Sequence, residues 1–345
     1  MHAIDLSSFL LFGLIWSFAW CETPTKLFTP LSNELIDYIN NKPGGTWKAA
    51  KTTRFRSVDE VKQLLGTLPE PKHLRNSRRP TVTHEDKQIN LPEQFNSSMK
   101  WPNCPGIALI RDQSSCGSCW AFGAVSAMSD RVCIHSQGKK QVELSAVDLL
   151  SCCFDCGFGC EGGWIGPAWD YWVSSGIVTG GSKESKTGCQ PYPFPRCEHH
   201  TNGSYGPCPK KHYETPECKN ECVPGYATPY PEDKYKAKNS YNLLQDEETI
   251  MKEIMINGPV EAAINVYEDL PNYRSGVYQH TTGKLLGGHA VRLVGWGTDN
   301  GTKFWLVANS WNEHWGDNGY FRILRGKNEC GVESGVSAGL PAVDN

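Results

Sequence analysis

The uneven distribution of cysteines is the feature that most constrains how this chain folds. The 345-residue chain has fifteen cysteines, of which Cys21 stands alone and the other fourteen lie between Cys104 and Cys330. In a reducing cytosol so many thiols would indicate metal sites, whereas in an oxidising compartment they indicate a disulfide framework. With 39% hydrophobic and 21% charged residues, the chain can bury a core. This composition excludes a disordered chain, a collagen and a coiled coil.

A short apolar run near the N-terminus indicates the compartment. Ser8–Trp20 has about the length of a signal-peptide apolar region and is too short to span a bilayer. Residues 1–20 are therefore predicted to be a signal peptide, with a buried N-terminal helix as the alternative. The cysteines favour export, so we expect the secretory pathway, with the lysosome or the extracellular space as destination. Three glycosylation acceptors would then be usable, at Asn96, Asn202 and Asn300.

Charge divides the chain near residue 90. Residues 22–90 hold 12 Lys+Arg against 8 Asp+Glu, whereas residues 91–345 hold 22 against 28, and the net charge is −3. This balance gives no electrostatic case for a nucleic-acid partner, and no membrane span is expected. A basic, cysteine-free segment thus precedes an acidic, cysteine-rich body. We interpret residues 21–90 as a removable pro-segment that inhibits a body formed by residues 91–345; an ordinary small helical subdomain is the alternative.

Hydrophobic periodicity predicts a helical half followed by a β half. Residues 32–39 have a helical stripe behind Ser32 as cap, residues 57–65 repeat that pattern, and residues 118–135 form a longer helix with one apolar stripe. Residues 151–230 are dense in Gly, Pro and Cys, which predicts loops held by cross-links rather than a packed helix or sheet. Short β-like runs follow, at 260–267, 289–294, 304–307 and 320–324. The expected class is α+β.

One cysteine is placed to act as a nucleophile. Cys119 stands at the start of the expected helix, where the partial positive charge favours thiolate over thiol. His289, after two glycines at a strand, could be its imidazole partner, and Asn309, directly after another strand, could orient that ring. Gln113, six residues before the thiol, could donate to a developing oxyanion.

These residues also have other readings. Cys116 and Cys119 form a C-x-x-C pair, which fits a dithiol redox site, or half of a zinc site completed by Cys153 and Cys156. A disulfide-stapled binding module without catalysis is a further alternative. The residue pattern by itself leaves these open; we expect neither a metal nor a cofactor.

The longer motifs resemble a known family. The segment Cys116-Gly-Ser-Cys119-Trp120 matches the C-G-[SA]-C-[WY] signature of papain and the cathepsins. The similarity continues through Gly287-Gly-His289-Ala and Asn309-Ser-Trp311, and the paired-histidine loop over 197–208 resembles the occluding loop of cathepsin B. The chain thus resembles a cathepsin B-like cysteine peptidase of the papain family. This resemblance implies a zymogen with two lobes, helical on the left and β-barrel-like on the right, an active-site cleft between them, and an occluding loop over about 189–222.

The resemblance also implies roles for single residues. Cys119 is the nucleophile, His289 its imidazolium partner, and Asn309 the group that orients the ring, while Gln113 and the Cys119 backbone N–H form the oxyanion hole. Trp311 would shield the histidine–asparagine contact from water. The substrate-binding residues implied are Gly162, Gly163, Trp311, His199, His200, Ala290 and Gly335. The implied activity is endopeptidase, with removal of C-terminal dipeptides as a second activity, on peptide and protein substrates, with cystatin-type inhibitors as partners.

The family pattern further implies a disulfide pairing. The pairs are Cys104–Cys133, Cys116–Cys160, Cys152–Cys218, Cys153–Cys156, Cys189–Cys222 and Cys197–Cys208. Cys119 stays free for chemistry and Cys330 as a structural thiol, and Cys21 is lost with the signal peptide.

Two departures from the family pattern carry expectations. The family latches its loop through an ion pair for which this chain has Tyr205 and His314, so no ion pair is expected there and the loop should be looser. A first latch between His199 and Asp112 is retained. Gly335 stands where the family often carries a glutamate, which predicts apolar side chains at the second residue before the scissile bond (P2).

Overall fold

The computed structural model describes residues 28–70, 79–198 and 204–343. Predictions for the signal peptide and for His199, His200 and Asn202 therefore lie outside the described residues. The described helices are α1 Asn33–Asn40, α2 Val58–Lys62, α4 Ser97–Lys100, α5 Cys119–His135, α6 Ala146–Cys152, α7 Ile165–Ser174 and α8 Glu247–Asn257, with 3-10 turns η1 Pro105–Ala108, η2 Gly159–Glu161, η3 Leu270–Asn272 and η4 Glu329–Gly331. The strands are β1 Trp47–Ala49, β2 Thr81–Val82, β3 Phe95–Asn96, β4 Ala237–Leu243, β5 Val260–Tyr267, β6 Tyr273–Tyr278, β7 Leu285–Asp299, β8 Thr302–Ala308, β9 Tyr320–Leu324 and β10 Val336–Pro341.

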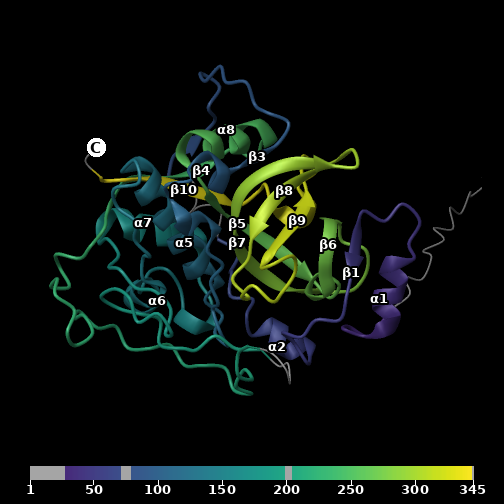
Figure 1. Ribbon diagram of the computed structural model, residues 1–345, viewed down its shortest axis with the longest axis horizontal. Helices are drawn as coiled ribbons and strands as arrows, with labels where there is room; N and C mark the ends of the chain where they lie inside the picture. Colours follow the sequence, from purple (N-terminus) through teal and green to yellow (C-terminus); the bar gives the residue numbers. More distant parts are fainter. Residues whose placement is uncertain (1–27, 71–78, 199–203, 344–345) are drawn as a thin grey trace, which may run out of the picture.

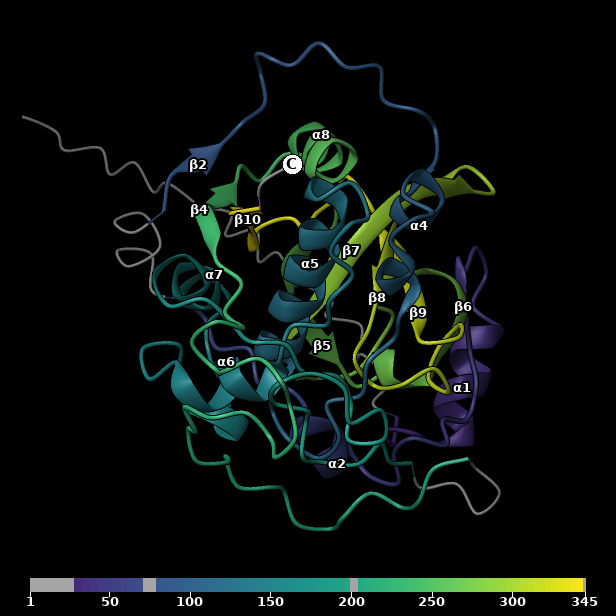
Figure 2. The same cartoon turned by 60° about the vertical axis from the view of Figure 1, so that its left-hand side comes forward.

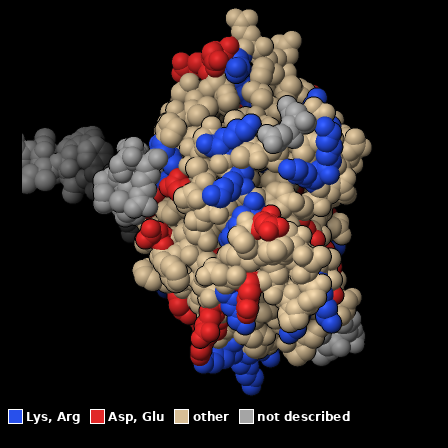
Figure 3. Space-filling view, turned by 90° about the vertical axis from the view of Figure 1, so that its left-hand side faces the viewer, with Lys and Arg blue, Asp and Glu red and all other residues tan. Residues whose placement is uncertain are grey.

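These elements form two lobes, one helical and one built of strands, which confirms the predicted α+β class. Helices α5, α6 and α7 lie on one side and strands β5 to β9 on the other, while α1 and β1 lie beyond β6 at the far edge of the sheet (Figure 1). No helix in the described parts of the chain is long and apolar enough to cross a bilayer. On the face of the helical lobe, basic and acidic side chains are scattered among a larger area of other residues (Figure 3).

Helix α5 is the central helix of the molecule. It begins after Ser118, as predicted, but 13 of its 17 residues are buried, so it is covered on nearly every side instead of having one apolar stripe. It packs against α6 and α7 on one side and against β7 and β10 on the other. The Ser118 side chain makes no capping bond; its hydroxyl lies 3.1 Å from the Tyr192 hydroxyl.

The segment 151–230 is loop-rich, but one helix was missed. Helix α7 buries Trp169 and Trp172 completely, and this aromatic burial stabilises a helix despite glycine and proline in its first turn. The structure joins the same six cysteine pairs that the resemblance implies, listed here in chain order: Cys104–Cys133, Cys116–Cys160, Cys152–Cys218, Cys153–Cys156, Cys189–Cys222 and Cys197–Cys208. Five of them have at least one cysteine inside 151–230, so cross-links replace a large core there.

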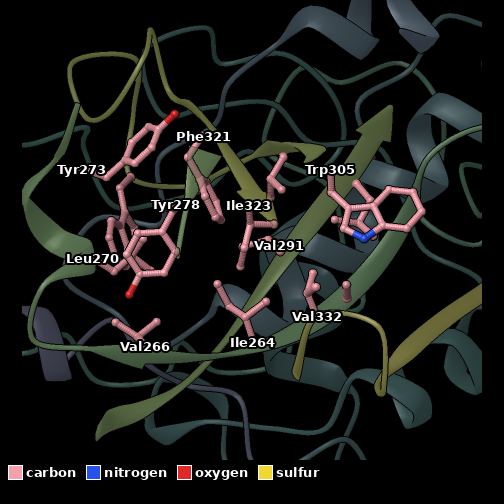
Figure 4. Packing of buried hydrophobic residues seen from close by; sticks show 14 of the residues in the cluster. Ile264, Val266, Leu270, Tyr273, Tyr278, Val291, Trp305, Phe321, Ile323 and Val332 are labelled. Atoms are coloured by element: carbon pink, nitrogen blue, oxygen red, sulfur yellow. The ribbon is translucent and has the colours of Figure 1, made fainter. Parts of the chain in front are cut away.

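The sheet of the second lobe is open, which corrects the expected barrel. Its strands run in the order β1-β6-β9-β8-β7-β5-β10-β4-β2, with β3 added to β7. The edge strands β1 and β2 both come from residues before 91, and no bond between them is recorded in the described ranges. The runs at 260–267 and 320–324 are strands over those same residues, whereas the other two belong to longer strands. Side chains from β5, β7, β8 and β9 fill the core of this lobe (Figure 4).

The N-terminal segment wraps around both lobes. Helix α1 has the predicted cap, because the Ser32 hydroxyl accepts from the backbone N–H of Leu35 at 3.2 Å, and it buries Leu35 and Ile39. Helix α2 is shorter than predicted and ends near the cleft. After β2, the chain runs past α8 to β3 and α4 (Figure 2). Both lobes are thus contacted by residues that precede position 91.

Candidate active site

Cys119 lies at the first position of α5 and is fully buried. The backbone N–H of Gly66 donates to its sulfur at 3.2 Å, and the Thr67 hydroxyl lies 3.3 Å from it. The backbone of Ala290, the residue after His289, also contacts the thiol. The sulfur therefore sits at the junction of the two lobes, covered by a turn of the N-terminal segment.

The predicted histidine and asparagine lie side by side. His289 is on β7 and Asn309 directly follows β8, which pairs with β7; the ring Nε2 donates to the Asn309 side-chain oxygen at 2.7 Å. The Trp311 ring, fully buried, lies 4.8 Å from the imidazole and covers that contact. The other ring nitrogen, Nδ1, is buried and makes no hydrogen bond of good geometry in the described ranges, although the Leu64 backbone lies near enough to the ring to oppose the lowering of its pKa. The tautomer is thereby fixed with Nδ1 left for chemistry.

Gln113 is fully buried and its amide is held in place. Its Nε2 donates to the Leu64 carbonyl at 2.9 Å and to the Cys116 carbonyl at 2.8 Å. Its Oε1 accepts from the Ser310 hydroxyl at 2.8 Å. The Leu64 carbonyl of the N-terminal segment thus lies where the carbonyl of a substrate peptide would accept a hydrogen bond from the Gln113 amide.

The N-terminal segment lies in the cleft as an extended peptide. Gly163 donates from its N–H to the Gly66 carbonyl at 2.8 Å and accepts from the Leu68 N–H at 2.9 Å. The Thr67 N–H donates to the Gly288 carbonyl at 3.1 Å on the opposite wall. The neighbouring Gly162 has a φ of +116°, a conformation that favours glycine. Both walls of the cleft therefore recognise a main chain rather than a particular side chain.

The covered pair is held in its neutral form. Burial raises the pKa of the Cys119 thiol, although hydrogen bonds from Thr67 and nearby backbone groups oppose the shift. Burial also lowers the pKa of His289 from 6.5 to about 4, against the effect of its bond to Asn309. Desolvation disfavours both charged forms, so a thiolate–imidazolium pair requires the N-terminal segment to leave.

The cysteine pairing also bears on the redox reading. Cys116 is bonded to Cys160, and Cys119 is free. The C-x-x-C motif is therefore divided between a disulfide and a single thiol, and it is not a dithiol pair. Cys153 and Cys156 are bonded to each other, which removes them as metal ligands.

Comparison with known sequences decides the family. The family described as "Papain family cysteine protease" matches residues 91–340, and the family described as "Peptidase family C1 propeptide" matches residues 31–71. This chain belongs to the papain family of cysteine proteases. It carries the family's propeptide in front of the peptidase domain, and it is a cathepsin B-like zymogen.

Individual relatives agree with that assignment. A cathepsin B-like cysteine proteinase of Schistosoma japonicum is 57% identical over 311 residues, covering 90% of this chain and 91% of that protein. Cathepsin B-like cysteine proteinase 6 of Caenorhabditis elegans is 52% identical and covers 91% and 84%. Among solved structures, proCathepsin B S9 from Trypanosoma congolense has a TM-score of 0.79 at 41% identity and covers 91% of this chain and 100% of that one.

The second latch of the loop over 189–222, at Tyr205 and His314, differs from expectation. Arg196 Nη1 lies 3.0 Å from a Glu313 oxygen, and the Tyr205 hydroxyl donates to the same carboxylate. His314 Nδ1 lies 2.6 Å from Glu198. The expectation that no ion pair forms here is wrong. Arg196, which bonds to the Tyr205 hydroxyl, and Glu313, which precedes His314, supply the two charges instead. The argument for a looser loop falls with it.

The first latch is occupied by the propeptide. Asp112 accepts from Arg54 at 3.4 Å, as well as from the N–H of Cys197 and the side chain of Asn312, both at 3.1 Å. Its predicted partner His199 lies outside the described residues. In the zymogen, therefore, a propeptide arginine holds the carboxylate.

Gly335, the residue predicted to set specificity, lines a cavity beside the cleft. Gly335 and Ala263 belong to a cavity of about 480 Å³ that Leu68 and Glu70 of the propeptide also line. A Cβ at position 335 would lie 3.2 Å from the Ala263 methyl group. The position is thus tightly packed, as well as uncharged.

Sequence reasoning missed one ionisable group behind Cys119. Glu261 is fully buried in β5, accepts from the Trp169 indole at 2.8 Å and lies against α5 at Gly123. Burial raises its pKa well above the usual value, although the hydrogen bond from Trp169 opposes the shift. A glutamate inside the buried apolar run 260–267 was the available signal.

Acid is expected to loosen the propeptide through His289. A ring with pKa about 4 when covered and 6.5 when hydrated takes up a proton more readily in the uncovered state, so its contribution to propeptide docking is present above pH 6.5 and lost as pH falls toward 4. Over that range the loss reaches roughly 3 kcal/mol. The measurement uses a Cys119→Ser background because no thiolate can form beside the ring there, so the proton that His289 takes up is not offset by one that Cys119 loses. Hydrogen exchange at residues 64–68 of a Cys119→Ser zymogen should therefore speed up between pH 6.5 and 4.

The matched control is His289→Gln in the same background. This variant should show a smaller acceleration over the same range. An equal acceleration in both proteins would assign the effect to other groups.

Proposed function

We propose that this zymogen becomes a peptidase that hydrolyses peptide bonds through Cys119 and His289. The observation that carries the proposal is the peptide already in the cleft: the propeptide main chain is bonded to Gly163 and Gly288, with the Leu64 carbonyl on the Gln113 amide. A cleft that binds backbone on both walls and directs an amide donor at a carbonyl suits any peptide sequence. The expected substrates are therefore peptides and proteins.

The mechanism follows from the positions of three groups. Once hydrated, Cys119 ionises and His289 carries the proton on Nδ1. The sulfur attacks the peptide carbonyl carbon, while the Gln113 amide and the Cys119 backbone N–H bind the oxyanion. His289 passes its proton to the leaving amine as the carbon–nitrogen bond breaks and a thioester remains. Water then attacks the thioester, His289 takes its proton, and the acid leaves with the thiolate restored.

We further propose that the enzyme removes C-terminal dipeptides when the loop over 189–222 blocks one end of the cleft. The Arg196–Glu313 pair, bridged by Tyr205, supports this role because it joins the base of the loop to the segment after β8. Although partial burial opposes the shift, the hydrogen bond from Tyr205 and the charge of Arg196 lower the pKa of Glu313. In the processed enzyme His199 would take the place of Arg54 on Asp112, and with His200 it would bind the terminal carboxylate of the substrate.

The test of this function uses paired substrates and one loop variant. Acid-processed protein is expected to release a dipeptide from a peptide with a free C-terminus faster than from its amidated twin. Glu313→Gln should lower that preference, and should raise cleavage of long blocked peptides by about 3- to 5-fold, the equivalent of roughly 1 kcal/mol for a half-exposed ion pair. The matched control is Glu232→Gln, at an exposed carboxylate.

Three outcomes separate the parts of the proposal. Absence of any peptide hydrolysis would reject the peptidase. Equal rates on free and amidated peptides would reject the dipeptidase alone, and an unchanged preference in Glu313→Gln would reject the latch.

The processing and destination of the chain are also proposals. We propose that the mature enzyme begins near Leu91, after removal of residues 1–20 and 21–90, and that it functions in a lysosome or outside the cell with cystatin-type inhibitors as partners. The six disulfides support an oxidising route. Among the acceptors, Asn300 is exposed in a turn, whereas the Asn96 side chain caps α4. Asn300 is therefore the better candidate for a glycan.

A further inference from the structure

A buried arginine of the propeptide lies in a site formed mainly by the peptidase domain. The Arg79 side chain is fully buried. Its Nη1 lies 2.5 Å from a carboxylate oxygen of Asp170, on α7, and its Nε donates to the side-chain oxygen of Asn242, on β4, at 3.3 Å. Its Nη2 lies 2.5 Å from Glu70, which belongs to the propeptide. Each nitrogen of the guanidinium therefore has an acceptor.

The site is shaped for a planar cation. A Cβ at Gly166 would lie 2.0 Å from Nη2 of Arg79, so the absence of a side chain at this position creates the space. The second oxygen of Asp170 accepts from the Ser240 hydroxyl at 2.7 Å, which fixes the carboxylate. The Ser337 hydroxyl lies 3.4 Å from the Asn242 oxygen. Gly166, which gives the site its space, and Asp170, which carries its charge, thus belong to the domain that remains after processing.

The site is continuous with the substrate cleft. Asn242 lines the cavity of about 480 Å³ that Ala263 and Gly335 also line. Glu70 and several propeptide residues before it also line this cavity. A substrate whose main chain bonds to Gly163 would enter this cavity with the side chains on the N-terminal side of its scissile bond.

Loss of the propeptide leaves this site short of a cation. Glu70 and Arg79 depart together, which removes one negative and one positive charge and leaves Asp170. The Asp170 side chain is only 28% exposed in the zymogen, and its one ion pair within the described ranges is with Arg79. A partly buried carboxylate that loses its partner is costly, which favours binding of another cation. A guanidinium would again meet two oxygens.

We propose that in the processed enzyme Asp170, Asn242 and Gly166 form a subsite for a basic side chain of the substrate, on the N-terminal side of the scissile bond. This inference rests on the proposed peptidase function. It changes the expectation drawn from Gly335, because the acidic group for an arginine lies at Asp170, which shares the Arg79 guanidinium with the cavity-lining Asn242, rather than at position 335. Arg79 occupies the subsite in the zymogen in place of the substrate's basic residue.

The experiment compares arginine with its neutral isostere citrulline. Acid-processed enzyme is assayed on peptide pairs that differ only by arginine or citrulline at the second, third or fourth residue before the scissile bond. At one position the arginine peptide should have a kcat/KM roughly tenfold higher. In Asp170→Asn this ratio should fall toward one. Gly166→Ala, which keeps the charge and fills the space, should also lower the ratio, whereas Glu232→Gln should not.

Each result bears on a single claim. A wild-type ratio near one at all three positions, or a ratio unaltered in both Asp170→Asn and Gly166→Ala, would overturn the subsite and leave Asp170 as a clamp for the propeptide only. If Asp170→Asn is not recovered folded, Gly166→Ala and Asn242→Ala decide. Failure of the wild-type enzyme to cleave the citrulline and arginine peptides alike would instead count against the peptidase function.

Discussion

Replacement of Cys119 by serine is expected to lower kcat/KM on any peptide substrate by at least about 10³-fold. A serine hydroxyl in the same place does not ionise in the range where a thiol beside an imidazolium does, so the nucleophile is lost. The substitution is small, and Cys119 forms no disulfide, so the fold should be retained. The measurement is hydrolysis by protein processed with an added protease, since this variant cannot process itself.

Two companion measurements make that result specific. His289→Ala should lower kcat/KM by a similar factor. The double variant should lower kcat/KM only a little further, because the two residues act as a unit. In processed wild-type protein one thiol, Cys119, should react rapidly with iodoacetamide, while the Cys116–Cys160 disulfide should not exchange. Residual activity within tenfold of wild type in Cys119→Ser would place the nucleophile elsewhere.

Replacement of Gly66 by alanine is expected to activate the zymogen without acid. A Cβ at position 66 would lie 1.7 Å from the Gly117 carbonyl oxygen and 2.4 Å from its carbon. Gly117 cannot withdraw easily, because its N–H donates to the Cys160 carbonyl at 2.8 Å beside the Cys116–Cys160 disulfide. The propeptide must therefore leave the sulfur, and iodoacetamide labelling of Cys119 at neutral pH should rise roughly 10- to 100-fold.

The control for this variant is a substitution on the same segment away from the cleft. Lys51→Ala, at an exposed position, should label as slowly as wild type. Cooperative thermal unfolding of Gly66→Ala would show that exposure of the thiol reflects release of the propeptide rather than global unfolding. A Gly66→Ala zymogen whose Cys119 is as protected as in wild type would contradict the docking geometry described above.

Features that depend on neighbouring residues could be predicted from the sequence. The Ser32 cap and the apolar residues of α1 lie within about two turns of each other, and the strand at 260–267 has its own β-like composition. The order of Gln113, Cys119, His289 and Asn309 could be recognised in the same way, because each residue lies within a short motif. The predictions failed where packing overrides local preference, as in α7, whose two buried tryptophans stabilise a helix in a Gly- and Pro-rich stretch.

Relations between distant residues required the tertiary structure. Arg196 meets Glu313 across 117 positions, and Arg79 meets Asp170 across 91. No periodicity links such residues; they meet because loops and strands cross, so a charge missing at one position can be supplied by another position nearby in space. The sequence by itself determined the family, and through the family resemblance the disulfide pairing, and it predicted Cys119 as the reactive thiol. Only the tertiary structure decided which carbonyl accepts from the Gln113 amide, how the loop over 189–222 is anchored and where the Arg79 guanidinium is bound. Each of these depends on groups that the fold brings together from distant parts of the chain.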